Sequence, residues 1–212
     1  MRRTPSVIGE IGRSFLVLPA GDPPGPGRRT PIYLGPGRAF GSGGHETTVS
    51  CVEEMEGLAP LKGSRVLDVG TGTGILGLAA LFLGAEYVVA LDVDPDAART
   101  ASGNAALNGT GDRMAVLCGT LASIRSGAAF DLVLANIYGD IVIREAGRLA
   151  GHLSPGGRLI ISGIQYHDST QVKGLFEGLG LTGLSVTFLE EYVTQVWLNP
   201  PAPAEEGASG RA

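Results

Sequence analysis

Residues 65–77 read RVLDVGTGTGILG, and this stretch decides the fold. A short apolar run passes through three alternating glycines, Gly70, Gly72 and Gly74, into a longer apolar run. Glycines at this spacing permit a tight turn and let a ligand approach the backbone closely at the start of a helix. The stretch therefore predicts a buried strand, a glycine turn and a helix at 73–84, as in a doubly wound α/β fold.

Strand and helix patterns alternate along the rest of the chain. Short apolar runs predict further strands at 86–92, 113–119, 130–137 and 157–164, and helical patterns lie at 94–109, 138–153 and 169–180. Residues 181–191 and 192–199 have the pattern of an antiparallel pair. Central strands that are apolar on both faces and are followed by helices indicate a parallel sheet covered on both sides. We therefore expect an α/β fold with a doubly wound, mostly parallel seven-stranded sheet and an antiparallel last strand.

The two ends of the chain differ from this alternating pattern. Residues 20–31, AGDPPGPGRRTP, are typical of an exposed linker, and 9–19 before them favour one short strand. The C-terminal tail has no apolar residue beyond alanine and is expected to be disordered. The chain is therefore divided into an N-terminal strand and linker, one ligand-binding domain and a disordered tail, at 1–35, 36–198 and 199–212.

Composition narrows the classes of function. A chain of 212 residues suits one well-buried domain, and a formal net charge of -5 argues against nucleic-acid binding, which needs clustered Lys and Arg. The longest apolar run is too short to span a bilayer, and the N-terminus lacks the apolar core of a signal peptide. We expect a cytoplasmic protein without a membrane partner, and the sequence leaves its oligomeric state open.

The cysteines and histidines do not suggest a metal centre. Cys51 and Cys118 lack CxxC spacing and are interpreted as free, buried thiols of a reducing compartment. His45, His152 and His167 are scattered and form no ligand pair, so no metal site is predicted.

Two acidic residues flank the glycine turn and bear on its ligand. Asp68 precedes the turn, and Asp92 ends the next strand, where it can accept hydrogen bonds from ribose hydroxyls. Residues 72–77 also fit the dinucleotide pattern GxGxxG, but Asp68 would repel a pyrophosphate. The pair favours an adenosine ligand that carries positive charge, so we predict S-adenosylmethionine rather than NAD. The alternative for Asp92 is a helix N-cap, a role for which Asp94 competes.

Five segments together carry a resemblance to a known family. They read AFGSGGHETT (39–48), VLDVGTGTGILGLAALFLGA (66–85), VVALDVDPDAARTASGNAALNG (88–109), LVLANIYGDI (132–141) and LSPGGRLIISGI (153–164). In this order they resemble the catalytic domain of PrmA-type ribosomal protein methyltransferases, within the class I S-adenosylmethionine-dependent methyltransferase superfamily. The resemblance runs from about Gly12 to Trp197.

The resemblance implies a function. It makes 36–198 a Rossmann-like methyltransferase domain that acts on lysine or α-amino groups, with a large-subunit ribosomal protein as the leading substrate. Full-length members carry an N-terminal recognition domain before the linker, and this chain begins almost at the linker. The alternatives are another protein lysine, a small-molecule amine, or a protein that binds S-adenosylmethionine without turnover.

The resemblance also implies cofactor contacts. In the family the glycine loop and its threonine pair lie over the cofactor, so one threonine would donate to the cofactor carboxylate. The alternative is that Thr47 or Thr48 only caps the helix at 46–58. The expected cofactor-binding residues are Phe40, Gly41, Thr47, Thr48, Asp68, Gly70, Gly72, Gly74, Asp92, Gly119, Thr120 and Asn136.

Asn136, at the end of the strand FDLVLAN, is the main catalytic candidate. Its amide can accept a hydrogen bond from an amine and hold the nitrogen lone pair in line with a methyl donor. The second candidate is Tyr138, which would shape the acceptor channel; the alternative for Asn136 is a satisfied strand-end amide. His45 is either a proton relay or structural, and Glu191 is either near the acceptor or an ordinary surface carboxylate.

Overall fold

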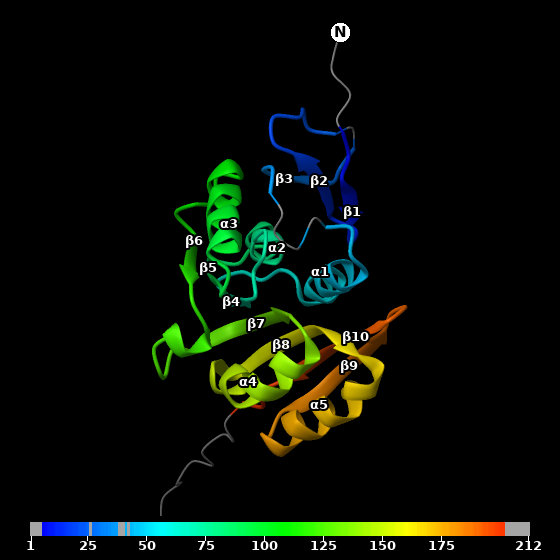
Figure 1. Cartoon of the computed structure of the whole chain (residues 1–212), viewed down its shortest axis with the longest axis vertical. Helices are drawn as coiled ribbons and strands as arrows, with labels where there is room; N and C mark the ends of the chain where they lie inside the picture. Colours follow the sequence, from blue (N-terminus) through cyan, green and yellow to red (C-terminus); the bar gives the residue numbers. More distant parts are fainter. Residues whose placement is uncertain (1–5, 26, 38–40, 42, 202–212) are drawn as a thin grey trace, which may run out of the picture.

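The computed structural model describes residues 6–25, 27–37, 41 and 43–201. Its main sheet has seven strands: β4 (Arg65–Val69), β5 (Tyr87–Asp92), β6 (Met114–Cys118), β7 (Phe130–Asn136), β8 (Leu153–Gln165), β9 (Thr182–Phe188) and β10 (Tyr192–Leu198). Their order is β6-β5-β4-β7-β8-β10-β9 (Figure 1). Strands β4 to β8 pair in parallel, whereas β10 is antiparallel to both β8 and β9. The predicted fold class is confirmed.

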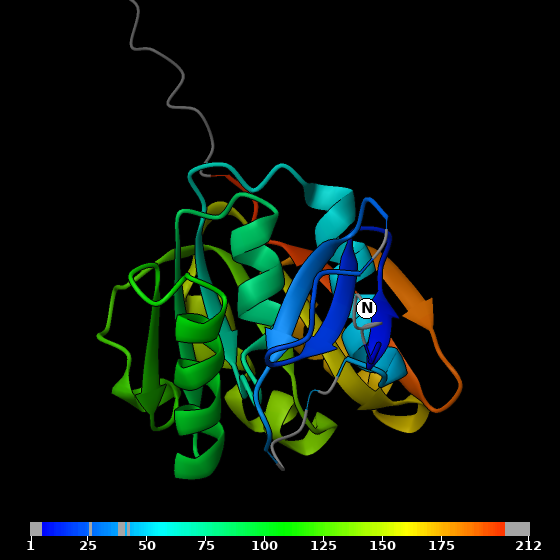
Figure 2. The same cartoon turned by 90° about the horizontal axis from the view of Figure 1, so that it is seen from above.

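Five α-helices cover the two faces of this sheet: α1 (Glu46–Leu58), α2 (Ile75–Phe82), α3 (Pro95–Leu107), α4 (Gly139–Gly151) and α5 (Tyr166–Gly178). Helices α1, α2 and α3 lie on one face, and α4 and α5 lie on the other (Figures 1 and 2). Neighbouring residues of one strand belong to different cores, because successive side chains point to opposite faces. In β7, Leu134 packs with the first group of helices and Val133 with the second.

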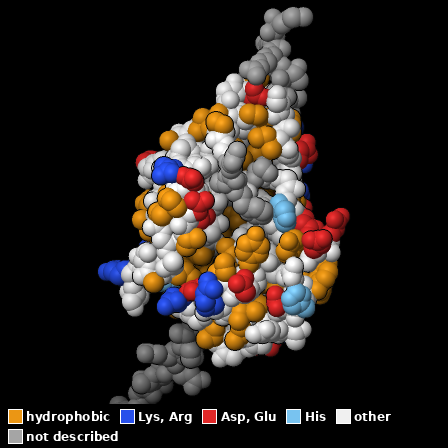
Figure 3. All heavy atoms as spheres, viewed as in Figure 1, with side chains coloured by type: hydrophobic (Ala, Val, Ile, Leu, Met, Phe, Trp, Pro, Cys, Tyr) orange, Lys and Arg blue, Asp and Glu red, His pale blue; other side chains and the backbone are white. Residues whose placement is uncertain are grey.

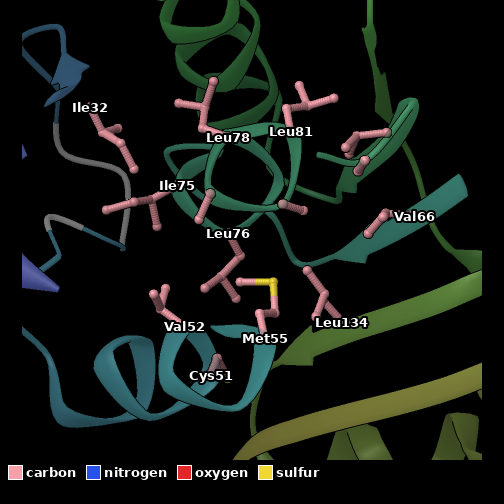
Figure 4. Close-up of a cluster of buried hydrophobic side chains, with 14 of the residues drawn as sticks. Ile32, Cys51, Val52, Met55, Val66, Ile75, Leu76, Leu78, Leu81 and Leu134 are labelled. Atoms are coloured by element: carbon pink, nitrogen blue, oxygen red, sulfur yellow. The ribbon is translucent and has the colours of Figure 1, made fainter. Parts of the chain in front are cut away.

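The chain before α1 forms more structure than the sequence predicted. Strands β1 (Gly9–Ile11), β2 (Phe15–Pro19) and β3 (Thr30–Leu34) make a three-stranded sheet, where one short strand was expected. Its buried side chains, such as Ile32, join the core formed by α1 and α2, and Figure 4 shows Ile32 near Ile75 in this core. Glu56 of α1 fixes the β1–β2 turn by accepting backbone hydrogen bonds from Arg13 and Ser14. Strands this short depend on such tertiary packing.

Two further expectations need correction. Asn199, the first residue of the predicted disordered tail, donates from Nδ2 to the carbonyl oxygens of Leu153 and Ser154, both at 3.1 Å. Residues 202–212 of that tail lie outside the described residues. Cys51 is buried as predicted, but Cys118 is exposed, because β6 is an edge strand and Cys118 is its last residue.

Within the described part of the chain, no helix is long and apolar enough to cross a membrane.

Candidate functional site

The glycine turn between β4 and α2 lies where the strand order reverses, since β5 pairs on one side of β4 and β7 on the other. Gly70, Gly72 and Gly74 all have positive φ, at 70°, 56° and 84°. A Cβ at Gly70 would lie 2.3 Å from the Ile137 side chain. The turn thus requires glycine both for its backbone conformation and for close packing.

Asp92 lies at the end of β5, directly beside this turn. One carboxylate oxygen accepts from the backbone N–H of Gly72 at 2.9 Å, and the other accepts from Asp94 at 3.0 Å. The N-cap of α3 is instead Asp94, whose side chain accepts from the N–H of Asp96. Each Asp92 oxygen retains a further lone pair, so the carboxylate can still accept hydrogen bonds from ligand hydroxyls.

Asp68 lies beneath the turn and is almost completely buried. Its Oδ2 accepts from the Thr71 hydroxyl at 2.6 Å and from the N–H of Gly77 at 3.1 Å. Burial raises the pKa of Asp68 to about 6, although these hydrogen bonds act in the opposite direction. In the structure Asp68 supports the turn, and its contact with a ligand ammonium stays a prediction.

The raised pKa of Asp68 makes stability depend on pH. The folded-state pKa of about 6 lies above the ordinary aspartate pKa of 3.8, so the folded protein loses stability as pH rises through this interval. The loss corresponds to about 3 kcal/mol. Asp68→Asn removes the titrating carboxyl, so the variant does not lose this stability as pH rises. We therefore expect the difference in free energy of unfolding, variant minus parent, to increase by about this amount between pH 4 and pH 7. Urea unfolding at several pH values measures it, and a pH-independent difference would contradict the assignment.

The glycine loop before α1 is tied to the glycine turn by residues that sequence reasoning missed. The Thr73 hydroxyl donates to the carbonyl of Gly41 at 2.6 Å. Asn104 donates from Nδ2 to the carbonyl of Thr73 and accepts at Oδ1 from the N–H of Gly35, both at 2.8 Å. Gly41 therefore lies beside the turn, and its contact with a cofactor stays a prediction. The predicted contact residue Phe40 lies outside the described residues.

The first turn of α1 brings the threonine pair to the end of β7. His45 is the N-cap, with its side chain accepting from the N–H of Thr47, so the alternative that Thr47 or Thr48 caps this helix is wrong. Both threonines are buried, and Thr48 Oγ1 accepts from Asn136 Nδ2 at 3.4 Å. The structure thus joins the glycine loop, Thr48 and Asn136 in one region.

The end of β7 at Asn136 packs closely against β8. Gly163 of the neighbouring strand β8 has a φ of 80°, and a Cβ there would lie 2.6 Å from the Ile137 carbonyl oxygen and 3.4 Å from Asn136 Oδ1. Tyr138 follows at the N-cap of α4 and is 73% exposed. This close packing holds the end of β7 against β8, while Tyr138 projects into solvent.

The remaining predicted residues lie at either side of this centre. The N–H of Gly119 donates to the Asp92 carbonyl at 2.8 Å, which places the Gly119–Thr120 segment beside the end of β5. The N–H of Glu191 donates to Glu46 Oε1, which places Glu191 on the β9–β10 turn next to α1. The arrangement combines a glycine turn and a carboxylate at the ends of β4 and β5 with a polar amide at the end of β7.

Comparison with known proteins gives a consistent result. The family model of ribosomal protein L11 methyltransferase (PrmA) matches residues 9–196. The chain is 44% identical over 178 residues to the ribosomal protein L11 methyltransferase of Geobacter sulfurreducens, covering 83% of this chain and 56% of that protein. The chain thus spans little more than half the length of this relative.

Solved structures agree at the level of the fold. A crystal structure of ribosomal protein L11 methylase from Lactobacillus delbrueckii subsp. bulgaricus matches with a TM-score of 0.80 and 29% identity, covering 93% of this chain and 100% of that chain. An RNA methyltransferase from Salinibacter ruber, in complex with S-adenosyl-L-homocysteine, shares the fold with a TM-score of 0.56 and 20% identity. The latter match covers 74% of this chain and 95% of that chain.

Proposed function

Because the chain belongs to the ribosomal protein L11 methyltransferase (PrmA) family, we propose that it is an S-adenosylmethionine-dependent protein N-methyltransferase. It transfers methyl groups to lysine or α-amino groups, and the leading substrate is a large-subunit ribosomal protein. The observation that carries the proposal is a combination of two features. One is the glycine turn, in which the N–H of Gly72 donates to Asp92, and the other is the side-chain amide of Asn136 at the end of β7.

The residues of the cradle fit S-adenosylmethionine better than a nicotinamide dinucleotide. The positive-φ glycines leave backbone rather than side chains facing the ligand, and Asp92 offers acceptors suited to ribose hydroxyls. The buried Asp68 places negative charge under the turn, which favours a cationic ligand and opposes a pyrophosphate. Gly41, Thr47 and Thr48 would lie at the methionine end, and Gly119 and Thr120 at the adenine end.

When bound, S-adenosylmethionine supplies a methyl group on a positively charged sulfur. The contribution of the chain is alignment: Asn136 accepts a hydrogen bond from the acceptor nitrogen and directs its lone pair toward the donor. A lysine amine has a reference pKa of about 10.4, so it must lose its proton before it reacts. Partial burial of the end of β7 favours the neutral amine by desolvation.

The test is methyl transfer from tritium-labelled S-adenosylmethionine to purified large-subunit ribosomal proteins by the full chain. We expect label in protein, recovered after hydrolysis as methylated lysine or a methylated N-terminal residue. Label in RNA or only in free amines would reject protein methylation. Cofactor binding without any transfer would favour a binding-only protein, and preferential NADH binding would reject the cofactor.

A further inference from the structure

A groove opens between the start of α1 and the β9–β10 turn. It has a volume of about 410 Å³ and is lined by Gly44, His45, Glu46, Glu190, Glu191 and Tyr192. We propose that this groove, together with the exposed rings of Tyr166 at the start of α5 and Phe188 at the end of β9, docks the lysine-bearing, positively charged segment of the acceptor protein. We call these residues the hairpin surface. The proposal rests on the methyltransferase function proposed above and concerns how its substrate is recognised.

The hairpin surface lies next to the acceptor amide. Asn136 pairs with Ser162 of β8, and β8 continues to Gln165, which pairs with Tyr192 of β10. The carboxyl end of β8 therefore lies three residues beyond Ser162, the residue opposite Asn136, and the first residue of β10 lies beside that end. On the α1 side, Thr48 contacts Asn136, and His45, one helical turn earlier, packs its ring against Tyr192 at 5.6 Å between centroids. The groove wall at His45 is thus one turn of α1 away from Thr48, the residue that contacts the amide.

The hairpin surface is held rigidly. Glu46 accepts from the backbone N–H groups of Glu190 and Glu191, at 2.8 and 3.2 Å. On the other side, the Tyr166 hydroxyl donates to the carbonyls of Leu189 and Glu190. Because the turn is fixed from both neighbouring helices, a partner would meet a surface that is already formed, which lowers the entropic cost of binding.

Exposed aromatic side chains lie next to the same turn, at the start of α5 and the end of β9. Phe188 is 68% exposed and Tyr166 is 45% exposed, and their rings lie 5.8 Å apart between centroids. Large apolar side chains that gather on a surface are typical of protein contacts, and aromatic residues dominate the binding energy at such contacts. Figure 3 shows acidic and apolar side chains side by side over this part of the molecule.

Charge identifies the occupant. Glu46 is engaged by the turn, whereas Glu190 and Glu191 are exposed, and no Lys or Arg occurs among the described residues that line the groove. A negative groove attracts a basic polypeptide and repels the phosphates of a nucleic acid. The aliphatic stem of a lysine also packs well on tyrosine and phenylalanine rings. A basic protein segment therefore fits both the charge and the apolar part of the hairpin surface.

The test is binding of a fluorescein-labelled oligolysine peptide, measured by anisotropy without cofactor. We expect Glu190→Lys/Glu191→Lys to weaken binding at least about tenfold and to flatten its salt dependence. The control is Glu86→Lys/Asp112→Lys, which changes the net charge equally at exposed residues just before β5 and β6, at the opposite edge of the sheet. The control is expected to bind within about twofold of the parent, because the effect is local.

The outcomes separate this proposal from the proposed function. Equal weakening by both double variants would show that only overall charge matters and would overturn the docking proposal. Tighter binding of a labelled single-stranded RNA than of the peptide by the parent would also overturn it. Selective weakening supports docking even if no methyl transfer is found. If the charge reversal impairs folding, Glu190→Gln/Glu191→Gln provides the same comparison. A raised KM for ribosomal protein with unchanged S-adenosylmethionine affinity in this variant would support the proposal.

Discussion

The variant Asn136→Ala is expected to bind S-adenosylmethionine within about threefold of the parent affinity and to lose about 100-fold or more in kcat. Loss of a single aligned polar group in an active site has an effect of about this size. The amide lies at the end of β7, held by Thr48 from α1 and packed near Gly163 of β8. If it orients the acceptor nitrogen, its removal leaves the nitrogen free to adopt unproductive directions, which slows transfer more than it weakens binding.

Single-turnover methyl transfer and calorimetric titration with S-adenosylmethionine measure the two quantities separately. The matched control is Asn199→Ala, which also removes a hydrogen-bonded side-chain amide, but one that bonds to the start of β8 at the far end of β10. The control is expected to keep the parent kcat. A parent-like kcat in Asn136→Ala would identify Asn136 as a satisfied strand-end amide and leave the acceptor site without its proposed anchor.

The sequence predicted those parts of the fold that depend on local pattern. The strand that precedes the glycine turn and the helix at 94–109 were predicted from apolar pattern and terminal residues, and they correspond to Arg65–Val69 and Pro95–Leu107. Asp94 and Gly109 mark the two ends of that helix because their preferences for a cap and for positive φ are local properties. The position of β10 between β8 and β9 places the antiparallel strand inside the sheet rather than at its edge.

The contacts that join distant segments were beyond such reasoning. Asn104 is a polar residue in a helical pattern, and nothing in its neighbourhood indicates that it bonds to both Gly35 and Thr73. His45 caps α1 although threonine is the stronger N-cap by preference, because the two threonines are buried, one of them against Asn136. Propensity describes isolated segments, whereas here the contacts with distant residues determine which side chain caps the helix and where Asn104 bonds.

Asp92→Ala is expected to give the largest loss of cofactor affinity. The carboxylate holds the backbone N–H groups of Gly72 and Asp94, so its removal both loosens the glycine turn and eliminates the acceptors proposed for the ribose hydroxyls. A lost hydrogen bond to a charged group costs about 1–3 kcal/mol, which corresponds to a dissociation constant about 5- to 150-fold higher. Asp92→Asn keeps one acceptor but places an amide donor where the second N–H needs an acceptor, so we expect an intermediate loss.

The matched control for Asp92→Ala is Asp94→Ala, two residues along the same connection. Asp94 caps α3 through the N–H of Asp96. Its loss is expected to lower the melting temperature while leaving the dissociation constant within about twofold, because a cap acts on helix stability. Calorimetric titration of both variants distinguishes a ligand contact from a general loosening of the β5–α3 connection. Equal weakening in the two variants would mean that this carboxylate acts through the fold alone, and the ribose would then have to be bound by other residues.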